Sequence, residues 1–311
     1  MLLAVAAAVV TIQLVNTTYF SAQQPVRDYL QAMRDGNGPK ALGLLRADLP
    51  AASPALLDGN ALKGATKDLK DVTIGDPQPL ADGKERVGID YQLAGTAGHT
   101  DFTLEPAGRE WLFFGTWRFV PSALPTVDVS VVNQTQARIN GVPVAMPGGR
   151  NSFSMLFPGR YTSTYNSQYF QAPGVDVTVT GPQSRPAAVA LATAPTQELL
   201  SQVDNRIHAY LDGCAKAQVL LPAGCPLSAS SDNRVVGPVQ WSILTYPKVA
   251  ISAYGGHWVM APMSVKAQVS FKEELLSNGN VHNVRTAADF AFTARLGIGN
   301  DVVTVTPEVQ Y

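Results

Sequence analysis

Four short motifs could supply reactive groups, but two of them lack a residue that their chemistry needs and the other two have a simpler explanation. The run Ser231-Asp232-Asn233 matches one element of penicillin-interacting enzymes, but no Ser-x-x-Lys sequence supplies the nucleophile. Residues 59–64 have the glycine spacing of a phosphate-binding loop, yet Ala65 stands where that loop needs a lysine. Ser264-Val265-Lys266 and Ser270-Phe271-Lys272 would place serine and lysine on one face of a strand. A solvated strand face explains the same alternation, so we predict no catalytic residue.

The histidines offer an acid/base pair but no metal site. The four of them, His99, His208, His257 and His282, are scattered, and none begins a His-Glu-x-x-His or His-x-His pattern. This spacing predicts neither a metal nor a cofactor. His208 and Asp204 lie one turn apart on a predicted helix and could act as general acid and base if that helix faced a cavity. An isomerase- or hydrolase-type enzyme for a small apolar substrate is therefore the alternative interpretation of the chain.

Two groups of aromatic residues could bind sugars or peptides by ring stacking. The first contains Tyr161 and Tyr165 among threonine, serine, asparagine and glutamine residues, and core packing is the alternative for it. The second contains Tyr254, His257 and Trp258 beside two consecutive glycines, which permit close approach of the backbone. These five residues are the predicted binding residues.

The only two cysteines, Cys214 and Cys225, are separated by ten residues that include proline and glycine. Outside the cytoplasm such a pair is expected to form a disulfide, which would contribute on the order of 2 to 3 kcal/mol by closing a short loop. Two free thiols in a reducing compartment are the alternative.

The N-terminus predicts a membrane anchor over residues 1–20. Leu2 to Val15 is apolar except for Thr11 and Gln13. The run is shorter than the ~20 residues that span a bilayer, and no Lys or Arg precedes it. Met1 could therefore be an internal start, or the segment a cleaved signal, whereas Asn16 to Phe20 is typical of a helix leaving the membrane interface. We expect an uncleaved single-pass anchor with the bulk of the chain outside the cytoplasm; a buried core helix is the alternative.

Composition restricts the class of protein. A chain of 311 residues with 46% hydrophobic residues can bury more than one core, which predicts two or three domains. A net charge of −1 with 15% charged residues provides no field that would attract nucleic acid, so we exclude that partner. Frequent glycine and proline with short runs of alternating valine and threonine indicate many strands.

The order of elements predicts an α+β protein with three units after the anchor. Residues 21–121 place short amphipathic helices before a four-stranded antiparallel meander. Residues 126–181 form a small all-β module with a hairpin turn at Asn140-Gly141. Residues 191–311 open with a long apolar helix stripe, contain the cysteine loop and continue as strands. We expect two cone-like domains, each a helix with a curved antiparallel sheet, on either side of the β module.

Two segments carry a resemblance to known domains. Residues 26–37 and 40–45 resemble the start of extracytoplasmic domains with the nuclear-transport-factor-two-like, cystatin-like cone, in which a helix ends at a Gly-Asn corner and a second short helix follows. Residues 138–142 and 156–161 resemble small surface β domains with Asn-Gly and Pro-Gly-x-Tyr turns. The whole arrangement is similar to the zinc-ribbon-associated envelope proteins of Gram-positive bacteria, including the teicoplanin-resistance-associated membrane proteins, although no zinc ribbon precedes the anchor here.

This resemblance implies a role at the cell wall and carries over no catalytic residue. Together with the anchor, it predicts a noncatalytic envelope protein whose extracytoplasmic domains bind a cell-wall polymer or another envelope protein. Such a protein could signal through its helix to a cytoplasmic partner.

Overall fold

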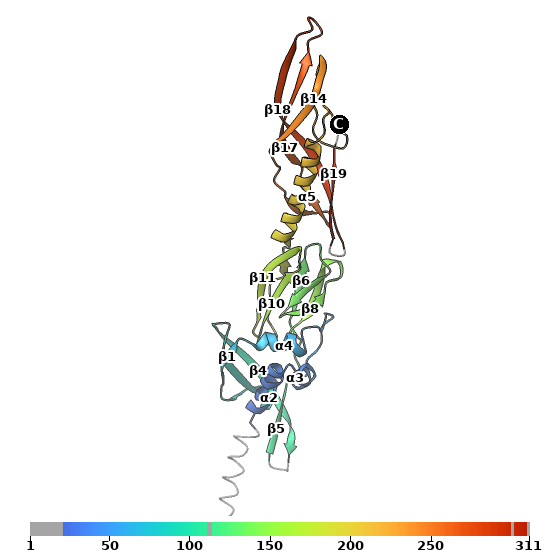
Figure 1. Ribbon diagram of the computed structural model, residues 1–311. Helices are drawn as coiled ribbons and strands as arrows, with labels where there is room; N and C mark the ends of the chain where they lie inside the picture. Colours follow the sequence, from blue (N-terminus) through green and yellow to red (C-terminus); the bar gives the residue numbers. More distant parts are fainter. Residues whose placement is uncertain (1–20, 111–113, 300–301, 310–311) are drawn as a thin grey trace, which may run out of the picture. The chain divides into compact units, whose positions relative to one another are not determined.

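The computed structural model describes residues 21–110, 114–299 and 302–309. The chain has a mixed α+β fold, with four α-helices and mostly strands among the described residues (Figure 1). It divides into two compact units: unit 1 is Met1–Tyr165 with Ala172–Ala192, and unit 2 is Asn166–Gln171 with Thr193–Tyr311. The predicted domain 21–121 falls within unit 1, and so does the predicted module 126–181 except for Asn166–Gln171, which belongs to unit 2. The predicted anchor, residues 1–20, lies outside the described residues, among which no helix is long and apolar enough to cross a membrane.

Unit 1 begins with three short helices: α2 (Gln23–Asp35), α3 (Gly38–Leu45) and α4 (Gly59–Thr66). The apolar face of α2 is buried, as its helical spacing predicts. The helix ends at Gly36 with a φ of 67°, and a Cβ at this position would lie 2.5 Å from the carbonyl oxygen of Gly59. Only glycine therefore fits the corner between α2 and α3. The side chain of Asn37 then caps α3 by accepting a hydrogen bond from the Lys40 backbone at 3.0 Å.

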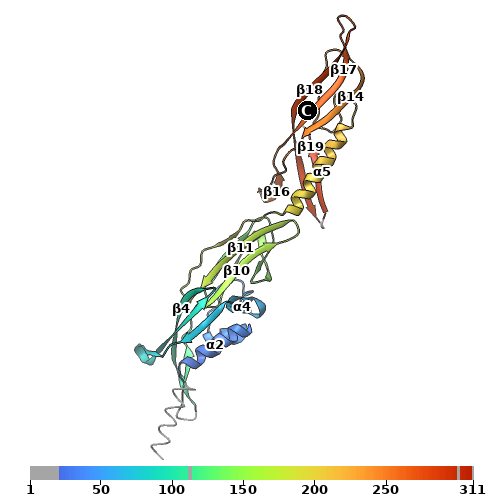
Figure 2. The same cartoon turned by 60° about the vertical axis from the view of Figure 1, so that its left-hand side comes forward.

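A curved antiparallel sheet follows the helices (Figure 2). Its strand order is β1-β3-β4-β5, with the short β2 paired to β3 beside the 3₁₀ turn Ala81–Gly83. The strands are β1 (Leu69–Ile74), β2 (Gln78–Pro79), β3 (Glu85–Leu93), β4 (Thr96–Glu110) and β5 (Phe114–Phe119). The register of β4 against β5 shifts between Pro106 and Gly108, and β5 is an edge strand that α2 and α3 contact. The helices α2 and α3 therefore lie beside an edge strand of the sheet.

The remaining strands of unit 1 form two small sheets. One has the order β12-β6-β9, with β12 parallel to β6, and the other contains β11-β10-β7-β8. Their bounds are β6 (Thr126–Val131), β7 (Gln136–Ile139), β8 (Val142–Ala145), β9 (Arg150–Ser154), β10 (Gly159–Asn166), β11 (Phe170–Val179) and β12 (Val189–Leu191), with a 3₁₀ turn at Pro147–Gly149. Asn140 and Gly141 have φ of 49° and 79° between β7 and β8, which confirms the predicted hairpin turn.

One hydrophobic core joins the helices, the curved sheet and the two small sheets of unit 1. At its centre the fully buried Tyr29 ring of α2 lies 5.6 Å from the Phe102 ring, 5.7 Å from Phe119 and 6.5 Å from Phe157. Its hydroxyl donates a 2.6 Å hydrogen bond to the Phe157 carbonyl. Asn140 adds a polar link, because its amide donates to the Ala61 carbonyl of α4 at 3.0 Å. The helices are therefore fixed to both the curved sheet and the β hairpins.

Unit 2 packs one long helix, α5 (Gln197–Ala215), on a second curved sheet of order β14-β17-β18-β19 (Figure 1). Thr196 caps the helix by accepting from the Leu199 backbone, and the buried stripe runs from Leu199 to Cys214. The strands are β13 (Ala194–Pro195), β14 (Arg234–Thr245), β15 (Ile251–Tyr254), β16 (His257–Met260), β17 (Met263–Glu274), β18 (Val281–Gly299) and β19 (Val302–Glu308). The strands β15 and β16 form a separate hairpin, and β13 pairs with Phe170 and Gln171.

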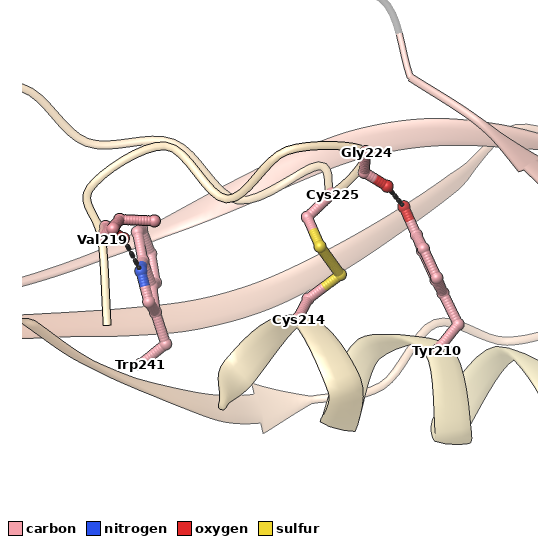
Figure 3. The surroundings of a disulfide bond; sticks show 6 residues. All are labelled: Tyr210, Cys214, Val219, Gly224, Cys225 and Trp241. Carbon is pink, nitrogen blue, oxygen red and sulfur yellow. Dashed lines mark hydrogen bonds between the residues drawn. A yellow bond between two sulfur atoms is a disulfide. The ribbon is translucent and has the colours of Figure 1, made fainter. Parts of the chain in front are cut away.

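A disulfide joins Cys214, in the last turn of α5, to Cys225, which confirms the predicted pairing (Figure 3). Two hydrogen bonds hold the loop between α5 and β14 on either side of it. The Tyr210 hydroxyl donates to the Gly224 carbonyl at 2.6 Å, and the Trp241 indole N–H donates to the Val219 carbonyl at 2.9 Å. The loop is thereby fixed to both the helix and the sheet.

Replacing Tyr29 by phenylalanine is expected to destabilise unit 1 by about 1 to 3 kcal/mol, because a buried carbonyl loses its hydrogen-bond donor while the ring packing stays. The measurement is urea denaturation of the full chain. Tyr165→Phe is the matched control, since its partly buried hydroxyl donates to the Gln134 side chain, and it should cost less. Equal losses for the two variants would contradict the role given to Tyr29.

Candidate functional site

An open groove on unit 1 combines an aromatic ring with charged and amide side chains. It lies between the first turns of α2, the end of α3 and the edge strand β5, and its volume is about 440 Å³. We call it the Trp117 groove. The lining residues with side chains suited to ligand contact are Gln24, Asp28, Arg46, Trp117 and Arg118. Its volume falls in the usual range for small-ligand sites.

The core of unit 1 positions the indole of Trp117. Trp117 and Phe119 are two residues apart on β5, so they lie on the same face of the strand. Phe119 is 1% exposed and packs against Tyr29, whereas Trp117 is partly buried at the margin of the same core. One part of the indole therefore packs inward and another part lines the groove.

A carboxylate beside the groove fixes two guanidinium groups. Arg46, which caps the end of α3, donates to Glu105 Oε1 at 2.7 Å and to the Phe119 carbonyl at 3.2 Å. Arg118 donates to the same Glu105 oxygen at 2.9 Å. These contacts, with the Arg46 hydrogen bond as the largest cause, lower the pKa of Glu105 below its ordinary value. Both arginines are thus held by an ionised acid, in orientations that leave further N–H donors for a ligand.

The groove carries donors, acceptors and an apolar face together. On α2, the Gln24 amide donates to Asp28 at 3.2 Å, which orients a carboxylate and an amide toward the same side. The face of an indole ring carries negative potential and attracts the polarised C–H groups of a sugar ring, while the polar side chains can pair with hydroxyl groups. The arrangement fits binding of a polyhydroxylated ligand.

The predicted first aromatic group divides into a core residue and a partly buried one. Tyr161 is 1% exposed, and its hydroxyl donates to the Leu156 carbonyl at 2.8 Å and accepts from the Leu156 N–H at 3.0 Å. Burial raises the pKa of this hydroxyl. Its ring has no face open to a ligand, so the core interpretation holds for Tyr161. Tyr165 is partly buried and donates to the Gln134 side chain at 2.6 Å.

The second predicted group lies on the β15–β16 hairpin of unit 2. Tyr254 and His257 are partners across the hairpin, and Tyr254 is 76% exposed. Trp258, the next residue along β16, stacks on Phe170 with ring centroids 4.1 Å apart. The structure therefore brings these three residues together on one hairpin, and their role in binding stays a prediction.

The acid/base pair of the alternative hypothesis lies on α5 with part of both side chains exposed. His208 Nε2 is 3.6 Å from the Asp204 carboxylate, and the imidazole stacks on the Tyr246 ring at 3.9 Å. The Tyr246 hydroxyl hydrogen-bonds to Asp212, which raises the pKa of Tyr246. Neither His208 nor Asp204 lines the Trp117 groove. The pair forms a polar network along one side of the helix.

The Ser231-Asp232-Asn233 element takes part in a buried polar cluster that the sequence did not reveal. Glu273, 8% exposed, accepts hydrogen bonds from the Ser231 hydroxyl and from the Asn233 amide at 3.1 Å. His282 Nε2 lies 3.0 Å from Glu273 Oε1, whereas the Ser231 hydroxyl donates to the other carboxylate oxygen, Oε2. The carboxylate stands between the serine and the histidine, so the imidazole does not accept the serine proton as a catalytic base would. The cluster anchors the loop before β14.

Neither a metal site among the described residues nor a similar protein indicates the function. Among residues 21–110, 114–299 and 302–309, no group of three or more His, Cys, Asp or Glu side chains could hold a metal ion. Comparison of the chain with family models, with curated proteins and with solved structures found no match. The function is therefore inferred from the sequence and from the geometry of the Trp117 groove.

Acid is expected to weaken unit 2 through Glu273. Hydrogen bonds from Ser231 and then Asn233, together with His282, lower the pKa of Glu273. Because the folded pKa lies below the unfolded value near 4.5, the contribution of Glu273 to stability is complete above that value and is lost as the pH falls through the folded pKa. Thermal unfolding of the full chain from pH 7 to pH 3 measures this loss.

Glu273→Gln should reduce the fall in unfolding temperature between pH 7 and pH 3, which we call the acid limb of the stability profile. Glu274→Gln is the matched control, because the neighbouring carboxylate contacts only Arg234, at 3.7 Å, among the ion pairs described, and it should keep the profile of the unmodified chain. A Glu273→Gln profile with the original acid limb would show that this cluster does not control it.

Proposed function

We propose that this chain is a noncatalytic protein of the cell envelope that binds a carbohydrate polymer of the wall through the Trp117 groove. The observation that carries the proposal is the partly buried indole of Trp117 in an open groove with polar side chains on its other walls. Such a combination of a rigid aromatic face with hydrogen-bonding groups is typical of sites for amphipathic ligands.

The charges of the groove favour a neutral ligand. Arg46 and Arg118 are balanced by Glu105 and Asp28, so the site has no excess of either sign. Guanidinium, carboxylate and amide groups can each pair with hydroxyl groups of a sugar. An open groove also allows a polymer to continue beyond the bound residue, whereas a closed cavity would accept only a small molecule.

Three features support the location in the envelope. The Cys214–Cys225 disulfide is expected in an oxidising compartment. The apolar run Leu2 to Val15 supports a single-pass anchor with the bulk of the chain outside the cytoplasm. The resemblance to zinc-ribbon-associated envelope proteins supports a role at the wall, and the order of helices before a curved sheet in both units supports cone-like domains.

An envelope protein is the other partner that the sequence predicts. The observation that favours a wall polymer is that the site is a groove with a balanced set of charges, rather than a broad apolar surface. A role in envelope signalling would add to this binding function, because an anchored domain that senses wall material can report through its helix.

Trp117→Ala should weaken binding to insoluble wall material roughly 10- to 30-fold, as expected when a central aromatic contact worth about 2 kcal/mol is removed. The measurement is co-sedimentation of the purified full chain with wall preparations. Trp117→Phe is the matched variant, because it keeps an aromatic face, and it should retain most of the binding. Thermal unfolding verifies that both variants fold.

Two results would overturn the proposal. The first is that the unmodified chain fails to sediment with wall material. The second is that Trp117→Ala sediments as well as the unmodified chain; if Trp258→Ala abolished binding instead, the site would lie on the β15–β16 hairpin. Competition by soluble wall glycan distinguishes a polymer from an envelope protein retained in the preparation.

A further inference from the structure

A second hollow, on unit 2, has a different chemistry from the Trp117 groove. It has a volume of about 670 Å³ and lies where β14, β17 and β18 run side by side. The polar lining residues are Gln240, Ser270, Lys272, Asn283 and Arg285. We call it the β14 hollow. No acidic residue is among those that line it.

A bulge in β14 forms the hollow. Val236 pairs with Lys272 and Gln240 pairs with Ser270, so three residues of β14 stand opposite one residue of β17. Gly237 in this bulge has a φ of 86°, and Pro238 has no N–H to donate to the ladder. A bulge of this kind bends its strand, and such bulges occur often beside functional sites.

The strand register gathers the polar side chains on one face of the sheet. Ser270 pairs with Arg285, and Lys272 pairs with Asn283. Positions 270 and 272 alternate with 271, so all four side chains lie on the same face. Lys272 and Arg285 are exposed on neighbouring strands, and hydroxyl and amide groups stand beside both.

Lys272 and Arg285 carry positive charge that no carboxylate of the described residues pairs with. Neither residue forms an ion pair within the described part of the chain. The neighbouring acids are already occupied: Glu274 faces Arg234 at 3.7 Å, and Glu273 accepts from Ser231 and Asn233 and faces His282. The hollow therefore holds an excess of two positive charges in a chain whose net charge is −1.

We propose that the β14 hollow binds phosphate groups, held by Lys272 and Arg285 with Ser270, Asn283 and Gln240 as further donors. A guanidinium matches two oxygens of one phosphate, an ammonium supplies a mobile point charge, and hydroxyl and amide donors complete the oxyanion shell. The volume of the hollow exceeds that of a single phosphate, so the ligand is a phosphate ester or a phosphate-linked polymer. This inference does not depend on the Trp117 groove.

The test is calorimetric titration of the full chain with a polyphosphate of defined length and, separately, with orthophosphate. We expect binding of the polymer that weakens as salt rises, because exposed charges are screened. Lys272→Gln with Arg285→Gln should lose at least about 10-fold in affinity, whereas Lys272→Arg with Arg285→Lys should keep most of it. Orthophosphate that binds as tightly as polyphosphate would contradict the ester or polymer proposed for the hollow, whereas polyphosphate that binds much more tightly than orthophosphate would support it.

A matched control separates the site from net charge. Lys40→Gln with Lys70→Gln removes two exposed positive charges from unit 1 and should leave the affinity unchanged. The proposal is overturned if this control loses as much affinity as the Lys272/Arg285 pair, or if neither phosphate ligand binds the unmodified chain. Wall glycan binding that persists in the Lys272/Arg285 variant would show that the two sites act independently.

Discussion

The packing of Tyr29 against Phe102, Phe119 and Phe157 is the interaction on which unit 1 depends. The rings of Phe102 and Phe119 fix α2 to the curved sheet. Phe157, which precedes β10, fixes α2 to the small sheets, because its ring lies near Tyr29 and its carbonyl accepts a hydrogen bond from the Tyr29 hydroxyl. Because Phe119 belongs to β5, the same packing holds the strand that carries Trp117. The groove is thus the margin of this core, where an edge strand, the start of α2 and the end of α3 approach one another without closing.

Local chemistry made part of this structure predictable. The apolar spacing of α2, the positive φ of the Asn140-Gly141 turn and the separation of Cys214 from Cys225 depend on neighbours in the sequence, and all three features are present. Tyr161 shows how polar neighbours in the sequence can accompany a buried ring. Its polar neighbours suggested a binding surface, but along β10 Thr162 and Thr164 occupy positions that alternate with the buried ones, and Ser163 is buried like Tyr161.

The Trp117 groove could not be predicted, because its parts are distant in the chain. Asp28, Arg46 and Trp117 come from three elements, and only the order of strands and the core packing bring them together. The β14 hollow depends in the same way on the register of β17 against β18 and on a bulge. The sequence contains a weak indication of the Glu273 cluster. Glu273 stands at one of the alternating buried positions of β17, and a buried carboxylate needs hydrogen-bond partners. Those partners lie about forty residues earlier in the chain, at Ser231 and Asn233.

The most direct test of wall glycan binding is to follow the indole N–H signals of isotopically labelled tryptophans by nuclear magnetic resonance while soluble wall glycan fragments are added. Trp241 provides an internal reference, because its indole N–H is occupied by the Val219 carbonyl and the residue is buried. We predict that the Trp117 signal shifts in a saturable manner and that the Trp241 signal stays in place. A Trp117 signal that does not move at fragment concentrations that saturate binding would contradict the assignment of this groove as the glycan site.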